Sequence, residues 1–127
     1  MTKKSILLID DDSDEFDFFL DAINKIPGLF DCSYAVSASA ALDLLDEFTP
    51  DFIFIDMNMP KVNGLECIAL LNETNKALGI PLFMYSTSGD PVMQRKAVSL
   101  GASGCYKKSG NPNSLVDILR EFYAKYC

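Results

Sequence analysis

The chain has 127 residues, of which 49% are hydrophobic, and its 18 acidic against 11 basic residues give a formal net charge of −7. This length and apolar content allow one domain to bury a core without disulfides or a structural metal, and they argue against disorder. Because phosphate backbones and anionic lipids repel a negative protein, sequence-independent binding to nucleic acid or to a membrane surface is disfavoured.

The absence of histidine and the wide spacing of the cysteines exclude or disfavour several kinds of catalytic and metal site. The chain has no histidine, which excludes Ser-His-Asp and Cys-His catalysis and His-ligated metals. The four cysteines lack a CxxC pair and are expected to be small buried apolar residues in a reducing compartment; they are Cys32, Cys67, Cys105 and Cys127. No signal peptide or long apolar run appears, so we expect a cytoplasmic protein.

Short apolar runs alternate along the chain with longer amphipathic stretches. Strands are expected at 5–9, 32–36, 52–55, 82–85 and 104–106, and helices near 13–26, 38–48, 64–76, 91–100 and 112–125. Five successive strand–helix units imply right-handed crossovers and a parallel sheet covered by helices on both faces. The runs ILLI and FIFI suit strands that are buried on both faces. The pattern therefore predicts an α/β fold.

Capping residues support the predicted helix boundaries. Asp90 and Asn111 each precede a proline, which places an N-cap before a proline at the first helical position. Asn63 with Glu66 fits a capping box. The same spacing predicts a second box for Asp12 with Glu15.

Polar residues follow four of the expected strands, at the sheet edge where ligands bind in open parallel sheets. They are Asp10 and Asp11 after the first strand, Asp56 after the third, Ser86, Thr87 and Ser88 after the fourth, and Lys107 and Lys108 after the fifth. Converging carboxylates repel one another unless a cation intervenes, and oxygen ligands suit Mg²⁺. A hydroxyl and an ammonium group suit phosphoryl oxygens. Each residue alone fits a cap or a surface position, but together they favour phosphoryl transfer to a carboxylate.

Four segments resemble the receiver domains of two-component response regulators: ILLIDDDSDE (6–15), PDFIFIDMNMPKVNG (50–64), IPLFMYSTSGD (80–90) and GASGCYKKSG (101–110). The resemblance extends over essentially the whole chain. It implies a flavodoxin-like fold with strand order 2-1-3-4-5 and five helices. It also implies that residues 1–127 form a single receiver domain without an output domain.

The resemblance assigns roles by position. It implies that Asp56 is the phosphoacceptor, and that Asp11, Asp56 and the backbone carbonyl of Asn58 ligate Mg²⁺ while Asp10 acts largely through water. It further implies that Ser86 and Lys108 bind the phosphoryl group. Asn58 and Ser88 would tune the rate of self-hydrolysis. The implied phosphodonor is a sensor histidine kinase or a phosphotransfer protein. Output would pass by contact to a downstream protein, with no enzymatic activity beyond self-phosphorylation and self-dephosphorylation.

Two positions depart from the family pattern. The usual aromatic switch position falls on Cys105, with Tyr106 one place later, and Ser109 replaces the usual proline. The paired lysines add an ambiguity, because alternation along a strand lets only one of them face the site. We expect Lys108 to face inward; a one-residue slip would instead bring Lys107 inward. Cys105, Tyr106 and Lys107 are candidates for the switch and output surface.

Two other functions fit parts of the sequence. Asp10 and Asp12 match the spacing of the nucleophile and acid in haloacid-dehalogenase-type phosphatases, although Asp14 stands where a small residue is needed. Alternatively, the departures at Cys105 and Ser109 are compatible with a degenerate receiver that acts only as a binding module.

Overall fold

The structure is a computed structural model that describes residues 3–59, 62–87, 90–108 and 111–127. One sheet contains five parallel strands in the order β2-β1-β3-β4-β5. The strands are β1 (Lys4–Ile9), β2 (Phe30–Ala35), β3 (Phe52–Asp56), β4 (Leu82–Ser86) and β5 (Gly104–Lys107). The helices that alternate with them are α1 (Ser13–Asn24), α2 (Ala38–Glu47), α3 (Gly64–Thr74), α4 (Pro91–Ser99) and α5 (Pro112–Tyr126). The predicted fold and strand order are confirmed.

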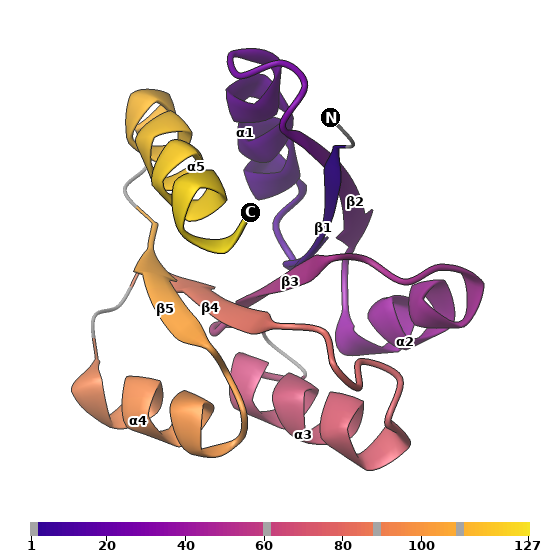
Figure 1. The fold of residues 1–127 in the computed structure, drawn as a ribbon. Helices are drawn as coiled ribbons and strands as arrows, with labels where there is room; N and C mark the ends of the chain where they lie inside the picture. Colours follow the sequence, from indigo (N-terminus) through magenta and orange to yellow (C-terminus); the bar gives the residue numbers. More distant parts are fainter. Residues whose placement is uncertain (1–2, 60–61, 88–89, 109–110) are drawn as a thin grey trace.

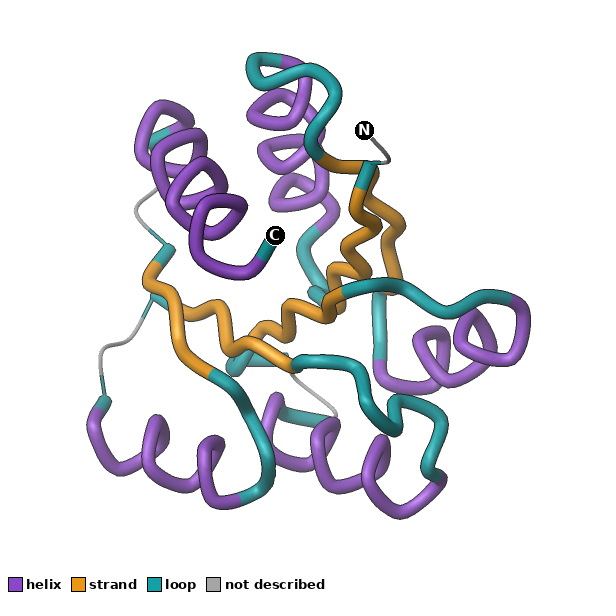
Figure 2. The backbone as a smooth tube through the Cα atoms, in the orientation of Figure 1, coloured by secondary structure: helices purple, strands orange, loops and turns teal. Residues whose placement is uncertain are grey.

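The helices form two layers, with α1 and α5 on one face of the sheet and α2, α3 and α4 on the other (Figure 1; Figure 2 shows the same arrangement as a backbone tube). Because side chains alternate along a strand, the apolar runs supply both faces. Ile6, Leu8 and Phe54 pack toward α1 and α5, whereas Ile9 and Ile55 pack toward the other layer. The central strands are therefore buried on both sides.

The two cores differ in composition. Seven buried aromatic residues lie in the α1/α5 core: Phe19, Phe30, Phe52, Phe54, Phe83, Tyr85 and Phe122. Phe122 of α5 contacts the rings of Phe52 and Phe83 edge-on, with centroids 4.8 and 4.9 Å apart. Within the described residues, the buried members of the other core are aliphatic or contain sulfur. We call these the aromatic core and the sulfur-containing core.

The second strand differs from its prediction. It begins at Phe30 rather than at residue 32 and ends at Ala35, which leaves Val36 52% exposed. The reason is its pairing with β1, which starts at Lys4 opposite Phe30 and is extended by a 3.0 Å hydrogen bond from the Lys4 amide to the Leu29 carbonyl. Local apolar character alone did not reveal this earlier start.

The predicted caps are only partly correct. The Asn63 side chain accepts a hydrogen bond from the Glu66 amide at 2.9 Å, as expected. Asp12 caps α1 through the Asp14 amide instead, also at 2.9 Å, while the Glu15 carboxylate faces Lys108. The second capping box is therefore wrong, because the Glu15 side chain is directed toward the sheet edge.

The cysteine prediction also needs correction. Only Cys67 is fully buried among the four cysteines, all of which are free thiols, and Cys127 is exposed. Burial raises the pKa of Cys67 to about 12. In the part of the chain that the structure describes, no helix is both long and apolar enough to cross a bilayer.

Candidate functional site

Three carboxylates meet at the carboxyl end of the sheet. Asp10 follows β1 and Asp56 ends β3, and these neighbouring strands pair in register through Ile9 and Ile55. One carboxylate oxygen from each of Asp10, Asp11 and Asp56 lies within 4.8 Å of the others. Asp10 and Asp56 are buried, whereas Asp11 is exposed. The convergence expected from parallel strands is therefore present.

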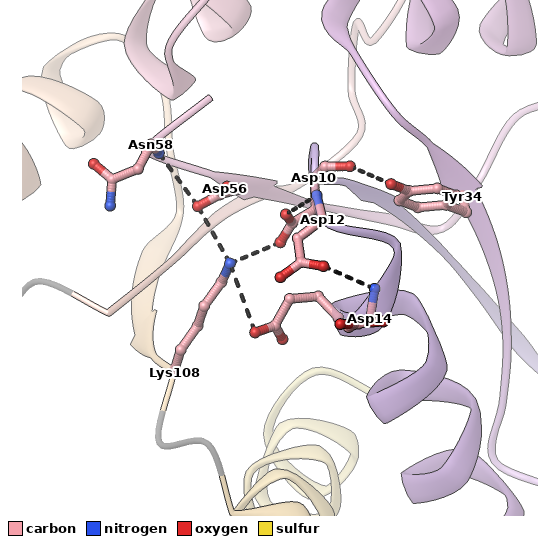
Figure 3. Close-up of polar contacts among 8 residues, drawn as sticks. Asp10, Asp12, Asp14, Tyr34, Asp56, Asn58 and Lys108 are labelled. Carbon is pink, nitrogen blue, oxygen red and sulfur yellow. Dashed lines mark hydrogen bonds and ion pairs between the residues drawn. The ribbon is translucent and has the colours of Figure 1, made fainter. Parts of the chain in front are cut away.

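Lys108 provides the positive charge at the centre of this cluster (Figure 3). Its ammonium group lies 2.7 Å from Asp10 Oδ2, 3.3 Å from Asp56 Oδ1 and 4.0 Å from Glu15 Oε1. The Lys108 amide also donates to the Ser86 carbonyl at 2.8 Å, which extends the pairing of β4 and β5. Lys107, the preceding residue, is exposed. Strand alternation thus directs Lys108 inward, in the register that we expected.

Burial and charge set the acidity of the cluster. Burial raises the pKa of Asp10 to about 6, although the hydrogen bond from Lys108 opposes the shift. The pKa of Asp11 is raised by burial and then by its interactions with Asp56. Burial lowers the pKa of Lys108, but the hydrogen bond to Asp10 and the charges of Asp10, Asp56 and Glu15 together outweigh this effect, and the net pKa is raised. Among the described residues, the Lys108 ammonium group faces Asp10, Asp56 and Glu15, and Asp11 lies beside them, so negative charge exceeds positive charge and favours a further cation.

The oxygen ligands at this edge suit Mg²⁺, which prefers one or two carboxylates together with water and phosphate oxygens. Both oxygens of Asp10 already accept hydrogen bonds, Oδ1 from the Asp12 amide at 2.9 Å and Oδ2 from Lys108. Asp11 and Asp56 are therefore better suited to direct ligation than Asp10. This arrangement fits a role for Asp10 through water.

The remaining predicted residues lie on the β4 and β5 side. Ser86 ends β4 and is buried, and it lines a cavity together with Asn58. The Asn58 amide donates to Asp56 Oδ1 at 3.2 Å. Ser88 and Ser109 lie outside the described residues.

Strand β5 sends Cys105 and Tyr106 to opposite faces. Cys105 packs against the sulfur-containing core. Tyr106 stacks on Phe54 with centroids 5.9 Å apart and thus belongs to the aromatic core. Burial, followed by the nearby Tyr126 hydroxyl, raises the pKa of Tyr106 to about 12. The Tyr106 ring therefore packs on the face of the sheet opposite α4, although Tyr106 is also one of the residues that line the cavity beside α4.

Sequence reasoning missed four residues that shape the site. The Tyr34 hydroxyl donates to the Asp10 carbonyl at 2.6 Å, the Tyr85 ring lies 5.3 Å from the Lys108 ammonium group, and Glu15 is that ammonium's third carboxylate neighbour. At Gly64, a Cβ would lie 2.8 Å from the Asp56 carbonyl oxygen. Only Tyr85 and Gly64 gave a signal in the sequence: a polar aromatic within a buried strand, and a glycine shortly after the acceptor.

Comparison with known proteins gives the family of this fold and site. The model of the response regulator receiver domain matches residues 6–120. The chain belongs to the response regulator receiver domain family. The haloacid-dehalogenase interpretation gains no support from this membership.

Relatives with established names show how the receiver domain is used elsewhere. The chain is 32% identical to the transcriptional regulatory protein CpxR of Escherichia coli strain K12, over 91% of this chain and 47% of that protein. Its identity to the nitrate/nitrite response regulator protein NarL of the same strain is 30%, over 92% of this chain and 53% of that protein. The chain thus spans about half the length of these relatives.

Solved structures share the fold at lower identity. The phosphorylated cyanobacterial phytochrome response regulator RcpA superposes with a TM-score of 0.83 at 22% identity, covering 99% of this chain and 97% of that one. The Vibrio cholerae chemotaxis protein CheY4 gives a TM-score of 0.81 at 22% identity, covering 94% and 98%. At this identity, the likeness establishes the receiver fold.

Proposed function

We propose that this receiver domain is a phosphorelay switch that accepts a phosphoryl group on Asp56 from a histidine kinase or a phosphotransfer protein. The observation that carries the proposal is the buried Asp56 carboxylate, which lies 3.3 Å from the Lys108 ammonium group within an acidic oxygen cluster. A carboxylate that accepts a phosphoryl group needs nearby positive charge, because negative charge accumulates around the phosphorus atom during transfer.

The chemical step follows from these positions. An Asp56 carboxylate oxygen attacks the phosphorus atom of a donor phosphohistidine; the new P–O bond forms as the P–N bond breaks, and the imidazole nitrogen keeps the electron pair. Asp11, Asp56 and the Asn58 carbonyl would hold Mg²⁺, with Asp10 acting through water, and the ion would neutralise charge on the phosphoryl oxygens. Lys108 then pairs with one phosphoryl oxygen, and Ser86 donates to another.

The fate of the phosphoryl group depends on residues beside Asp56. We assign the tuning of self-hydrolysis to Asn58 and Ser88, and we assign no other enzymatic activity to the domain. Because Lys108 contacts Asp10 in the unphosphorylated protein, its transfer to a phosphoryl oxygen alters the end of β5. The change would pass to a downstream protein through the surface of α4, β5 and α5.

The partners in this proposal are proteins. The acidic surface repels nucleic acid and anionic lipid, and the free thiols suit a reducing cytoplasm. The complete set of carboxylates, together with the inward Lys108, supports a working receiver rather than a degenerate binding module.

Intact-mass measurement with Mg²⁺ and acetyl phosphate tests the acceptor. The wild-type protein should gain one phosphoryl group that is stable in acid and labile in base, and Asp56→Asn should gain none. Asp43→Asn, which changes an exposed carboxylate of α2, is the matched control and should be phosphorylated normally. An adduct that persists in Asp56→Asn would show that another carboxylate is the acceptor.

A further inference from the structure

The first turn of α1 brings a carboxylate to the sheet edge. Its acidic residues are Asp14 and Glu15, and they differ in their surroundings. Asp14 is exposed, whereas the Glu15 side chain is only 18% exposed and its Oε1 atom lies 4.0 Å from the Lys108 ammonium nitrogen. Acidic residues at a helix start offset the helix dipole while they remain in water. Glu15 instead belongs to the charged network of the site.

Lys108 is anchored by groups other than Glu15. The Asp10 carboxylate accepts a hydrogen bond from its ammonium group at 2.7 Å, and Asp56 Oδ1 lies 3.3 Å from the same nitrogen (Figure 3). The Tyr85 ring lies 5.3 Å from it. At 4.0 Å, Glu15 contributes charge rather than a hydrogen bond. Glu15 therefore adds negative charge around Lys108 without being its main anchor.

The charge of Glu15 acts against a phosphoryl group on Asp56. Phosphoryl oxygens are anionic and need the Lys108 ammonium group as their partner. Glu15 offers that group a competing anion and also repels the phosphoryl oxygens. Because the Lys108 side chain is only 8% exposed, water screens these interactions incompletely. Glu15 lies outside the three carboxylates whose oxygens approach within 4.8 Å of one another, so we assign it no metal in return.

We propose that Glu15 is a positioning residue that opposes phosphorylation of Asp56, because its carboxylate competes with the phosphoryl oxygens for the Lys108 ammonium group. The statement rests on the proposed function. Glu15 leaves the bonds that form and break unchanged. It raises the donor concentration that is needed to phosphorylate a given fraction of the protein, and a residue of α1 thereby sets the sensitivity of a site built at the ends of the strands.

Phosphorylation kinetics test the direction of the effect. Burial raises the pKa of Glu15 and the charge of Lys108 opposes this shift, so rates are compared at about pH 8, well above ordinary carboxylate values. With saturating Mg²⁺, initial rates at several acetyl phosphate concentrations are followed by intact mass after an acid quench. We expect the second-order rate constant of Glu15→Gln to exceed that of the wild type about fivefold.

Two further variants separate a local charge effect from a structural one. Asp14→Asn removes the same charge from the same helical turn, but from solvent, and should be phosphorylated at the wild-type rate. Glu15→Asp keeps the charge on a shorter side chain and should lie between the wild type and Glu15→Gln. Loss of a merely structural contact would slow phosphorylation. A Glu15→Gln rate at or below that of the wild type, or an equal gain in Asp14→Asn, would overturn the proposal.

Urea unfolding without a phosphodonor tests the pairing with Lys108 itself. Glu15→Gln is made in the wild type and in Lys108→Met, which completes a double-mutant cycle. In the wild type the substitution removes an attraction to Lys108 as well as repulsion from neighbouring carboxylates, whereas in Lys108→Met it removes the repulsion alone. Glu15→Gln should therefore change the unfolding equilibrium constant about threefold more favourably in Lys108→Met. Equal changes in the two backgrounds would show that Glu15 and Lys108 are not paired.

The outcomes distinguish this proposal from the proposed function. A wild-type protein that gains no phosphoryl group contradicts the proposed function, whereas a wild type that is phosphorylated as fast as Glu15→Gln contradicts the role of Glu15 alone. The kinetic comparison uses only variants that keep Lys108, so it decides the proposal even where Lys108→Met does not fold.

Discussion

The two faces of the sheet are packed with different kinds of side chain. The aromatic core between the sheet and α1/α5 consists of interlocked rings, whereas the core beneath α2, α3 and α4 relies on aliphatic and sulfur-containing side chains. Cavities of about 360 and 370 Å³ both lie on the second side, one lined by Ser86 and the other by Asp11. The site therefore stands between a closely packed face and a face with room for rearrangement.

Lys108 is held from the aromatic side. The Tyr85 ring and the Glu15 carboxylate of α1 both lie near its ammonium group, and Phe19 supports Tyr85 with an edge-on contact at 5.3 Å. Asn58 and Ser86, in contrast, line the cavity between β4, β5 and α4. This difference suggests that one face fixes the resting position of the ammonium group and that the other responds when it moves.

Truncating one side chain on each face of the sheet to alanine should sharpen this contrast. Phe83 is fully buried among aromatic rings, so Phe83→Ala should lower the free energy of unfolding by about 3–5 kcal/mol. Met93→Ala, at the edge of the cavity, should cost only about 1 kcal/mol. Urea unfolding at matched m-values measures both. Similar losses in the two variants would show that the faces are packed alike.

The next comparison is between Lys107 and Lys108, the adjacent lysines at the end of β5. Lys108→Ala leaves the buried Asp10 carboxylate without its cation, and we expect a loss of about 3 kcal/mol in stability together with loss of the phosphorylation-dependent conformational change. Lys107→Ala should alter stability by less than about 0.5 kcal/mol. Urea unfolding and NMR spectra with and without acetyl phosphate provide the readouts. The reverse pattern would place Lys107 in the site.

The raised pKa of Asp10 predicts a pH dependence. Its value of about 6 exceeds the ordinary 3.8, so the folded state binds more protons than the unfolded chain between these values. Stability should therefore fall by roughly 2–3 kcal/mol as the pH rises from about 4 to about 6. Asp10→Asn should flatten this part of the curve in thermal unfolding experiments. A wild-type profile that is flat or rises over this interval would contradict the assignment.

Metal binding should give the smallest effect. Mg²⁺ at ten times its Kd should stabilise the protein by about 1.4 kcal/mol through mass action, and Asp11→Ala should weaken this response. In the absence of metal, Asp11→Ala should be neutral or stabilising, because it removes one of the repelling carboxylates. Equal Mg²⁺-induced shifts in Tm for the two proteins would remove Asp11 from the ligand set.

The sequence was most informative where geometry follows from topology. Parallel strands end at one edge, so the meeting of Asp10, Asp11 and Asp56 could be predicted without knowing any side-chain packing. The choice between Lys107 and Lys108 depended on a one-residue register, which alternation alone does not fix. Glu15 was interpreted as a cap, because local spacing cannot show that Lys108, distant in the sequence, attracts its carboxylate.

The cavity of about 360 Å³ between β4, β5 and α4, which Met57, Met84, Met93 and Cys105 help to line, could not be predicted from the sequence for a different reason. Its volume depends on how closely α4 approaches β4 and β5, which is a sum of many small contacts rather than a pattern in one segment. The departure at Cys105 marked the position, but it gave no information about the space beside it.

The close approach at Gly64 has a consequence for dynamics. A Cβ there would also lie 2.9 Å from the Met57 Cα atom, so the start of α3 rests directly on the backbone that follows Asp56. The Gly64 amide donates to the Met57 carbonyl at 3.2 Å. Exchange of this amide with deuterated solvent therefore requires the contact between the start of α3 and Met57 to open. Slow exchange would report that this contact stays closed while the end of β5 moves.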